Sequence, residues 1–225
     1  MESENQTVRP GAAALEKHLS LVPRNYAPFA HLAAAPLIGI VVLVAAIVNV
    51  ESFGWTGFAV VISTLVFANL VEWVAHRWLL HRRRRFWEVL YDRHVPMHHM
   101  IYRYGSMAVT GRKEWFFVLM PARGVLGIVI LAVPLAVSFR TLIGPDVGWI
   151  FLATAGLYAM AYELMHLSYH LPRNHPLQRL ALVRKLSRHH ERHHDVELMQ
   201  KRNFNVTLPL WDWILGTMAP KRPER

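Results

Sequence analysis

Four long apolar blocks, separated by polar links, dominate the chain. They cover residues 29–50, 54–75, 115–139 and 147–171. Each is long enough to cross the hydrocarbon core of a bilayer, about 30 Å, as a helix. Pro121 and Arg123 place the start of the third block in the membrane interface. The pattern therefore predicts an all-α integral membrane protein built as a four-helix transmembrane bundle.

The links between the blocks carry very unequal charge. Residues 76–114 contain nine Lys and Arg and residues 172–225 contain eleven, whereas the links at 51–53 and 140–146 contain one between them. Because cationic residues stay on the cytoplasmic side, both termini and the central loop are predicted to be cytoplasmic. The run RRRR at 82–85 is typical of an anchor to anionic lipid headgroups. The basic residues flank spans and form no recognition module, so no nucleic-acid partner is expected.

Three segments follow from this pattern: a cytoplasmic N-terminal segment at 1–28, a membrane domain at 29–217 and a basic C-terminal tail at 218–225. The first 25 residues lack the charged and apolar regions of a cleaved signal peptide. The chain has no cysteine, which excludes disulfides, zinc ribbons and thiol chemistry.

Histidine is the residue type whose positions are most informative. Three of the fourteen histidines (His18, His31 and His175) are isolated and are interpreted as ordinary polar residues. The others fall in HRWLLH after the second block, HVPMHH in the central loop, HLSYH at the end of the fourth block and HHERHH beyond it. The predicted topology puts these four groups on one side of the membrane, so the spans bring them together as a histidine-rich helical cap on the cytoplasmic face.

Neutral imidazole is a good ligand for borderline metals. Residues three or four apart share a helix face, which suits the histidines of the last two groups as paired ligands. A single such group is as consistent with hydrogen-bonded core residues as with ligands. Four groups on one side favour a metal site, and about ten imidazoles suit two ions with open positions.

The four spacings are HX4H, HX3HH, HX3H and HX2HH. Together with NFNVTLPLWDWILGT at 203–217, they resemble the fatty acid hydroxylase/sterol desaturase superfamily over residues 60–217. Asn205 stands where that family usually has glycine. The resemblance implies a non-haem di-iron centre that uses O2 and two electrons to attack an aliphatic C–H bond of a lipid dissolved in the bilayer. The ligands it implies are His76, His81, His94, His98, His99, His166, His170, His190, His193 and His194.

Four histidines compete for three ligand roles in the last group. At about 100° per residue, His190, His193 and His194 span about 100° of a helix, whereas the set with His189 in place of His190 spans about 140°. The family spacing HX2HH selects the same three, so His189 is predicted to flank the site. Glu72, Glu163 and Asp195 are candidates to accept a ring N–H from a ligand. Glu72 and Glu163 could equally pair with an interface arginine, and Asp212 could simply fix the turn in LWDW.

The resemblance also implies an electron donor. No cytochrome b5-like domain is recognisable in the chain, so a separate ferredoxin- or cytochrome-type protein is expected, and the basic face could dock an acidic one. Carotenoid ring hydroxylase is the alternative function. A membrane metal transporter or sensor is disfavoured because transporters place their ligands near the bilayer midplane. The sequence leaves open the substrate and the choice between hydroxylation and desaturation.

Overall fold

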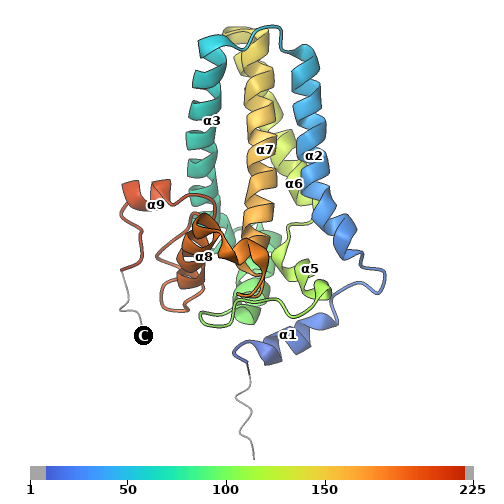
Figure 1. The fold of residues 1–225 in the computed structure, drawn as a ribbon, viewed down its shortest axis with the longest axis vertical. Helices are drawn as coiled ribbons and strands as arrows, with labels where there is room; N and C mark the ends of the chain where they lie inside the picture. Colours follow the sequence, from blue (N-terminus) through green and yellow to red (C-terminus); the bar gives the residue numbers. More distant parts are fainter. Residues whose placement is uncertain (1–8, 221–225) are drawn as a thin grey trace, which may run out of the picture.

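Four long helices form the body of the protein (Figure 1). The computed structural model describes residues 9–220, and these contain no β-strand. The long helices are α2 (Pro28–Asn49), α3 (Gly54–Ala75), α6 (Ala122–Leu142) and α7 (Pro145–Tyr169). All four are apolar and long enough to cross a membrane. The predicted all-α bundle with four potential spans is therefore confirmed, while the cytoplasmic placement of its cap stays a prediction.

Helix α7 is the centre of the bundle and packs against each of the other three long helices. Half of its most apolar stretch is buried, compared with 17% for α2, because α2, α3 and α6 turn their outer faces away from protein. Close approach depends on small residues: a Cβ on Gly148 would lie 2.5 Å from the Ala136 carbonyl oxygen of α6. Such contacts between small residues are typical of helix packing in lipid.

The third apolar block is interrupted. It begins with α5 (Trp115–Val118), leaves the helix at Leu119–Pro121 and resumes as α6. The break frees main-chain groups of Met120, and these find partners: its N–H donates to Glu163 Oε2 at 2.7 Å, and its carbonyl lies 3.0 Å from His31 Nε2. The break lies at Pro121, and Arg123 is in the first turn of α6; the placement of both residues in the membrane interface stays a prediction.

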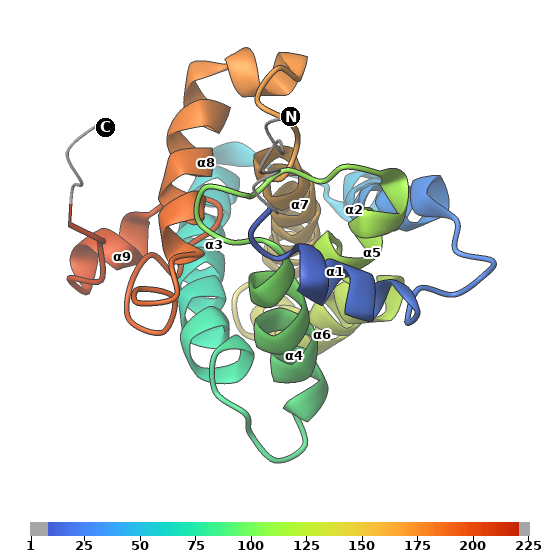
Figure 2. The ribbon, with the colours of Figure 1, turned by 90° about the horizontal axis from the view of Figure 1, so that it is seen from below.

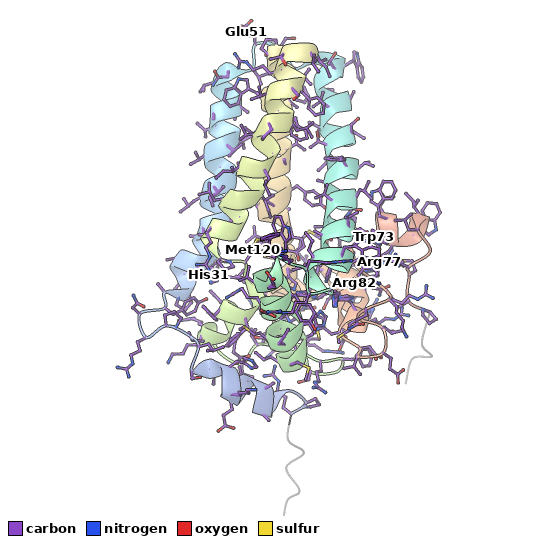
Figure 3. All side chains as sticks on the ribbon, turned by 180° about the vertical axis from the view of Figure 1, so that it is seen from behind. His31, Glu51, Trp73, Arg77, Arg82 and Met120 are labelled. Carbon is purple, nitrogen blue, oxygen red and sulfur yellow. The ribbon has the colours of Figure 1, made fainter. Side chains whose placement is uncertain are left out.

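The remaining elements gather at one end of the bundle, which we call the cap (residues 9–27, 76–121 and 170–203; Figures 1 and 2). Figure 3 shows Arg77 and Arg82 at this end and Glu51 at the other. At the far end the Glu51 and Ser52 N–H groups donate to the Asp146 carboxylate at 3.0 and 3.1 Å, which ties the two short links together. The elements of the cap are α1 (Ala12–Leu19), two π-helices (His76–Leu80 and His94–His99), α4 (Glu88–Arg93), α5, two short 3-10 helices (Arg112–Glu114 and Pro176–Arg179) and α8 (Ala181–His193).

A last helix, α9 (Leu210–Ile214), follows the cap and lies beside α3. It belongs to the C-terminal segment, residues 203–219. The predicted basic tail at 218–225 falls mostly on residues 221–225, and the start of the predicted N-terminal segment falls on residues 1–8; both lie outside the described residues. The three predicted segment boundaries stay predictions.

Candidate metal centre

The first two histidine pairs lie on π-helical turns. His76 and His81 are five residues apart, which would place them about 140° apart on an α-helix. In the π-helix at His76–Leu80 the His81 N–H instead donates to the His76 carbonyl at 3.1 Å, and this i→i+5 bond brings both rings to one face. His94 and His99 have the same spacing on the second π-helix. The sequence spacing HX4H is thus matched by an unusual backbone.

Two ordinary helices supply the other ligand candidates. His166 lies in the last turns of α7 and His170 follows directly at its end. Helix α8 places His190 and His193 at its C-terminus, and His194 caps it. The ten predicted ligands are all buried, with no side chain more than 8% exposed. The topology does bring the four sequence groups together, as predicted.

Nine of the ten rings form two groups by the positions of their ligand atoms. The first group is His76, His81, His94, His99 and His193, and the second is His98, His166, His170 and His190. Within each group the potential ligand atoms all lie within 4.8 Å of one another. His194 lies between the groups: its Nε2 is 3.0 Å from that of His190, and its ring stacks on His99 with centroids 4.1 Å apart. Neighbouring histidines in the sequence therefore divide between two sites.

The Nε2 atoms point inward in both groups. In the first, His94 Nε2 lies 2.9 Å from that of His76 and 3.0 Å from that of His99, and His81 Nε2 lies 2.9 Å from that of His193. In the second, His190 Nε2 is 3.1 Å from that of His166 and 3.3 Å from that of His170. A four- to six-coordinate metal with nitrogens at about 2.1 Å holds neighbouring nitrogens about 3.0 to 3.4 Å apart. The spacings fit two such ions.

Main-chain carbonyls fix the ring tautomers. The rings of five histidines hydrogen-bond through Nδ1 to a carbonyl oxygen, which can only accept. The N–H must therefore be on Nδ1, and Nε2 keeps its lone pair. Lone pairs that face each other across about 3 Å repel unless a cation lies between them. The five hydrogen bonds between a ring Nδ1 and a main-chain carbonyl join His76 to Phe204, His98 to Phe117, His170 to Met107, His193 to Arg202, and His194 to Tyr102.

Burial keeps these rings neutral. Outside the spans, burial and then the neighbouring imidazoles hold the pKa well below the ordinary 6.5 for seven of them. Burial also lowers the pKa of His170 to about 4. A neutral imidazole is the form that binds metal. In addition, His98 Nε2 is buried without a hydrogen-bond partner among the described residues, so its lone pair is available. The seven histidines whose pKa is held well below 6.5 are His81, His94, His98, His99, His190, His193 and His194.

Two of the candidate carboxylates, Glu72 and Glu163, have partners other than the predicted ring N–H groups, whereas the role predicted for Asp195 stays a prediction. Glu72 accepts hydrogen bonds from the Thr207 N–H and hydroxyl at 3.1 and 2.6 Å, and also from Tyr158 and the Val206 N–H. Glu163 accepts from Met120. No hydrogen bond joins a histidine ring to either carboxylate among residues 9–220, and for five of the ten rings a main-chain carbonyl accepts the ring N–H instead. Asp195 accepts the Glu197 N–H at 3.0 Å, a bond within its own turn.

The C-terminal segment supports the first group, and sequence reasoning gave it no such role. Its Phe204 carbonyl accepts from His76, and the preceding Arg202 carbonyl accepts from His193 at 2.8 Å. Buried Asp212 holds this stretch by accepting the Phe204 and Asn205 N–H groups at 2.9 and 2.8 Å. The LWDW motif marks this stretch in the sequence. Every residue has a main-chain carbonyl, however, so the sequence does not show which carbonyls accept from the histidine rings.

The histidines interpreted as ordinary polar residues lie outside both groups. The His18 ring bonds the Ala14 carbonyl one turn earlier at 2.7 Å, and His31 bonds Tyr26 and Met120. His175 caps the short 3-10 helix by accepting the Leu177 N–H. His189, predicted to flank the site, lies outside both groups, and its ring bonds Asp212 at 3.1 Å.

Comparison with known proteins identifies one family. The model of the fatty acid hydroxylase family matches residues 60–217, which contain all ten buried histidines and the C-terminal segment up to Thr217. No curated protein and no solved structure matches the chain.

Proposed function

The chain belongs to the fatty acid hydroxylase family, and from this premise we propose that it is an O2-dependent di-iron enzyme that oxidises an aliphatic C–H bond of a membrane lipid. The observation that carries the proposal is the presence of two groups of buried histidines whose Nε2 atoms face one another. The first group is His76, His81, His94, His99 and His193, and the second is His98, His166, His170 and His190. His194 is the tenth ligand, placed next to both groups.

An all-imidazole donor set suits zinc, copper, iron or nickel, so the choice of iron rests on the family. Iron would supply the activation of O2 that no side chain of this protein can provide. The family also favours a lipid chain as substrate, with hydroxylation or desaturation as its outcome. Hydroxylation inserts one oxygen atom and releases the other as water; desaturation removes two hydrogens and releases both oxygens as water. Each consumes two electrons and two protons.

The protein's own contribution is positioning and exclusion of water. Main-chain carbonyls orient the rings of five ligands, and burial shields all ten rings from bulk water. The groups lie where α3 and α7 enter the cap, so a lipid chain in the bilayer needs to move only a short way to reach them. Limiting bulk water around a reactive oxidant suppresses side reactions.

We further propose that electrons come from a separate, acidic ferredoxin- or cytochrome-type protein. A cleft on the cap is lined by Arg9, Arg173, Arg184 and Arg188 and reaches Met107. The Met107 carbonyl bonds the His170 ring at 2.9 Å, so this cleft approaches the second group through a single residue. Opposite charges on two partners steer docking and speed association.

The alternative, a carotenoid ring hydroxylase, requires the same oxidant. The match that continues through the C-terminal segment to residue 217 favours the lipid enzyme. A metal transporter or sensor is disfavoured by the placement of both groups at one end of the bundle, because a transported ion needs a path through its middle.

The test uses the full-length protein in vesicles of host lipid extract, with a reduced ferredoxin and 18O2. We expect a lipid product with one labelled oxygen, or one with two fewer hydrogens and labelled water. The His190→Ala variant serves as the inactive control. Turnover without O2, or product oxygen derived from water, would reject an oxygenase. A labelled carotenoid with no labelled acyl or sterol-like lipid would select the alternative.

A further inference from the structure

The C-terminal segment leaves the cap and turns back toward the bundle, so that α9 lies beside α3 (Figure 1). Residues 203–219 contain one charged residue, Asp212, and its side chain is fully buried. Lys201 and Arg202 stand directly before the segment, and Lys221 and Arg222 follow it in the sequence. An apolar stretch between two pairs of cations is typical of a segment that enters a membrane interface.

The contact with α3 sets the depth of this segment. Trp211 Nε1 donates to the Val66 carbonyl at 3.0 Å. Val66 precedes His76 by ten residues, about 15 Å along the helix axis. It is twelve residues, about 18 Å, from Gly54 at the far end of α3. Since α3 crosses a hydrocarbon core of about 30 Å, a residue anchored at Val66 lies within the apolar layer.

Several polar groups of the segment have partners within the protein, as insertion in a bilayer requires. Asn69 of α3 donates to the Thr207 hydroxyl and to the Leu208 carbonyl, both at 3.0 Å. Asp212 accepts from the main chain and from the Thr217 hydroxyl at 2.7 Å. These bonds also account for Asn69, a polar residue in the middle of a span, which would otherwise be costly in lipid.

The outer face of the segment is apolar and uncovered. Trp213 is 73% exposed and Leu208 55%, and Ile214, Leu215 and Met218 are exposed beside them. Val66, whose carbonyl bonds Trp211, and Phe67 of α3 are also exposed. Contiguous exposed apolar surface of this kind marks an interaction site.

We propose that residues 208–218, the α9 segment, are a re-entrant element inserted in the cap-side leaflet of the bilayer. The lipid chains cover Trp213 and its apolar neighbours, and Lys201 and Arg202 contact the headgroups. Continuity with the lipid-facing side of α3, and the depth of Val66, favour the bilayer as the occupant over a second protein. Through Asp212 the inserted element is linked to Phe204, whose carbonyl orients His76.

The absence of cysteine from the chain allows a direct test. Single variants Trp213→Cys, Ile214→Cys and Leu208→Cys carry a nitroxide label in the full-length protein in phosphatidylcholine–phosphatidylglycerol vesicles. Two similarly exposed positions serve as references: Ile62→Cys on α3, 61% exposed, and Val196→Cys in the cap, 56% exposed. Collision of each label with O2, which concentrates in lipid, and with a water-soluble nickel chelate is measured by electron paramagnetic resonance.

We expect labels at 208, 213 and 214 to resemble the label at 62, with a ratio of O2 to chelate collisions several-fold above that at 196. A ratio equal to that at 196 would overturn the proposal, because the segment would face water. Protection from both reagents, with spin–spin broadening that disappears on dilution with unlabelled protein, would also overturn it by assigning the face to a second copy. Metal content equal to that of the unlabelled protein verifies that each variant is folded.

Discussion

The Nε2 atom of His189 lies 3.1 Å from Oδ2 of Asp212, and this pairing turns His189 away from the ring cluster that its neighbour His190 joins. His190 is fully buried, with its Nε2 against those of His166 and His194. Two adjacent histidines therefore have separate tasks. One belongs to the ring cluster that we propose to bind metal, and the other fastens α8 to the C-terminal segment.

This separation predicts different effects of two alanine substitutions. His190→Ala should lose the iron of the second group and nearly all activity, because its Nε2 is central to that group. His189→Ala should keep most of both, since only the bond to Asp212 disappears. Iron per chain and turnover of the two purified variants test this. Loss of metal from His189→Ala with retention in His190→Ala would show that the register of α8 is wrong.

Asp212 is predicted to stabilise the C-terminal segment through the hydrogen bonds that its carboxylate accepts. Asp212→Asn replaces one acceptor oxygen by a donor that faces N–H groups, so buried donors lose their partner at a cost of about 1–3 kcal/mol. We expect a lower unfolding temperature and faster iron loss in detergent. Asp92→Asn is the matched control, because Asp92 pairs with Arg83 on the surface and its loss should change little. Equal effects of the two variants would contradict the role given to Asp212.

The spans and the ligand candidates could be predicted from the sequence because both depend on residue type and spacing. Blocks of some 20 apolar residues have few structural solutions, and the third span differed only where Leu119–Pro121 interrupts it. His166 and His170 share a face on any regular helix. The selection of His190 over His189 followed from the same helical geometry, and the structure places the two rings accordingly.

Other features depend on the backbone conformation and could not be predicted from the sequence. The π-helical turns at His76 and His94 arise from i→i+5 bonds that no residue type signals. The Phe204 and Arg202 carbonyls that orient two rings could have belonged to any residue. Glu72 and Glu163 were predicted from their proximity to ligands in the chain, yet they satisfy N–H groups of a distant segment and of a helix break.

The division of the rings into two groups predicts two iron ions per chain. His81→Ala removes a ligand of the first group and His98→Ala one of the second. Each variant should therefore retain about one ion, with activity lost in both because the two ions act together. His175→Ala, outside both groups, is the control and should retain two. A single ion in the active parent protein, measured by elemental analysis, would rule out the dinuclear centre.

The orientation of the bundle is the last prediction, and it follows from charge. The cap side carries almost all the Lys and Arg near the spans, and the far links carry only Arg140. Both far links lie at one end, since Asp146 accepts N–H groups from Glu51 and Ser52. Reporter fusions after residues 100 and 190 should indicate the cytoplasm, and insertions at 52 and 144 the opposite side. Adding arginines to the link at 51–53 is expected to reduce the fraction of protein molecules with this orientation. Cationic residues in short loops beside the spans stay on the cytoplasmic side, so the added charge favours the reverse orientation. A cytoplasmic reporter at 52 in the unmodified chain would place the histidine groups on the outer face, where a cytoplasmic electron donor could not reach them.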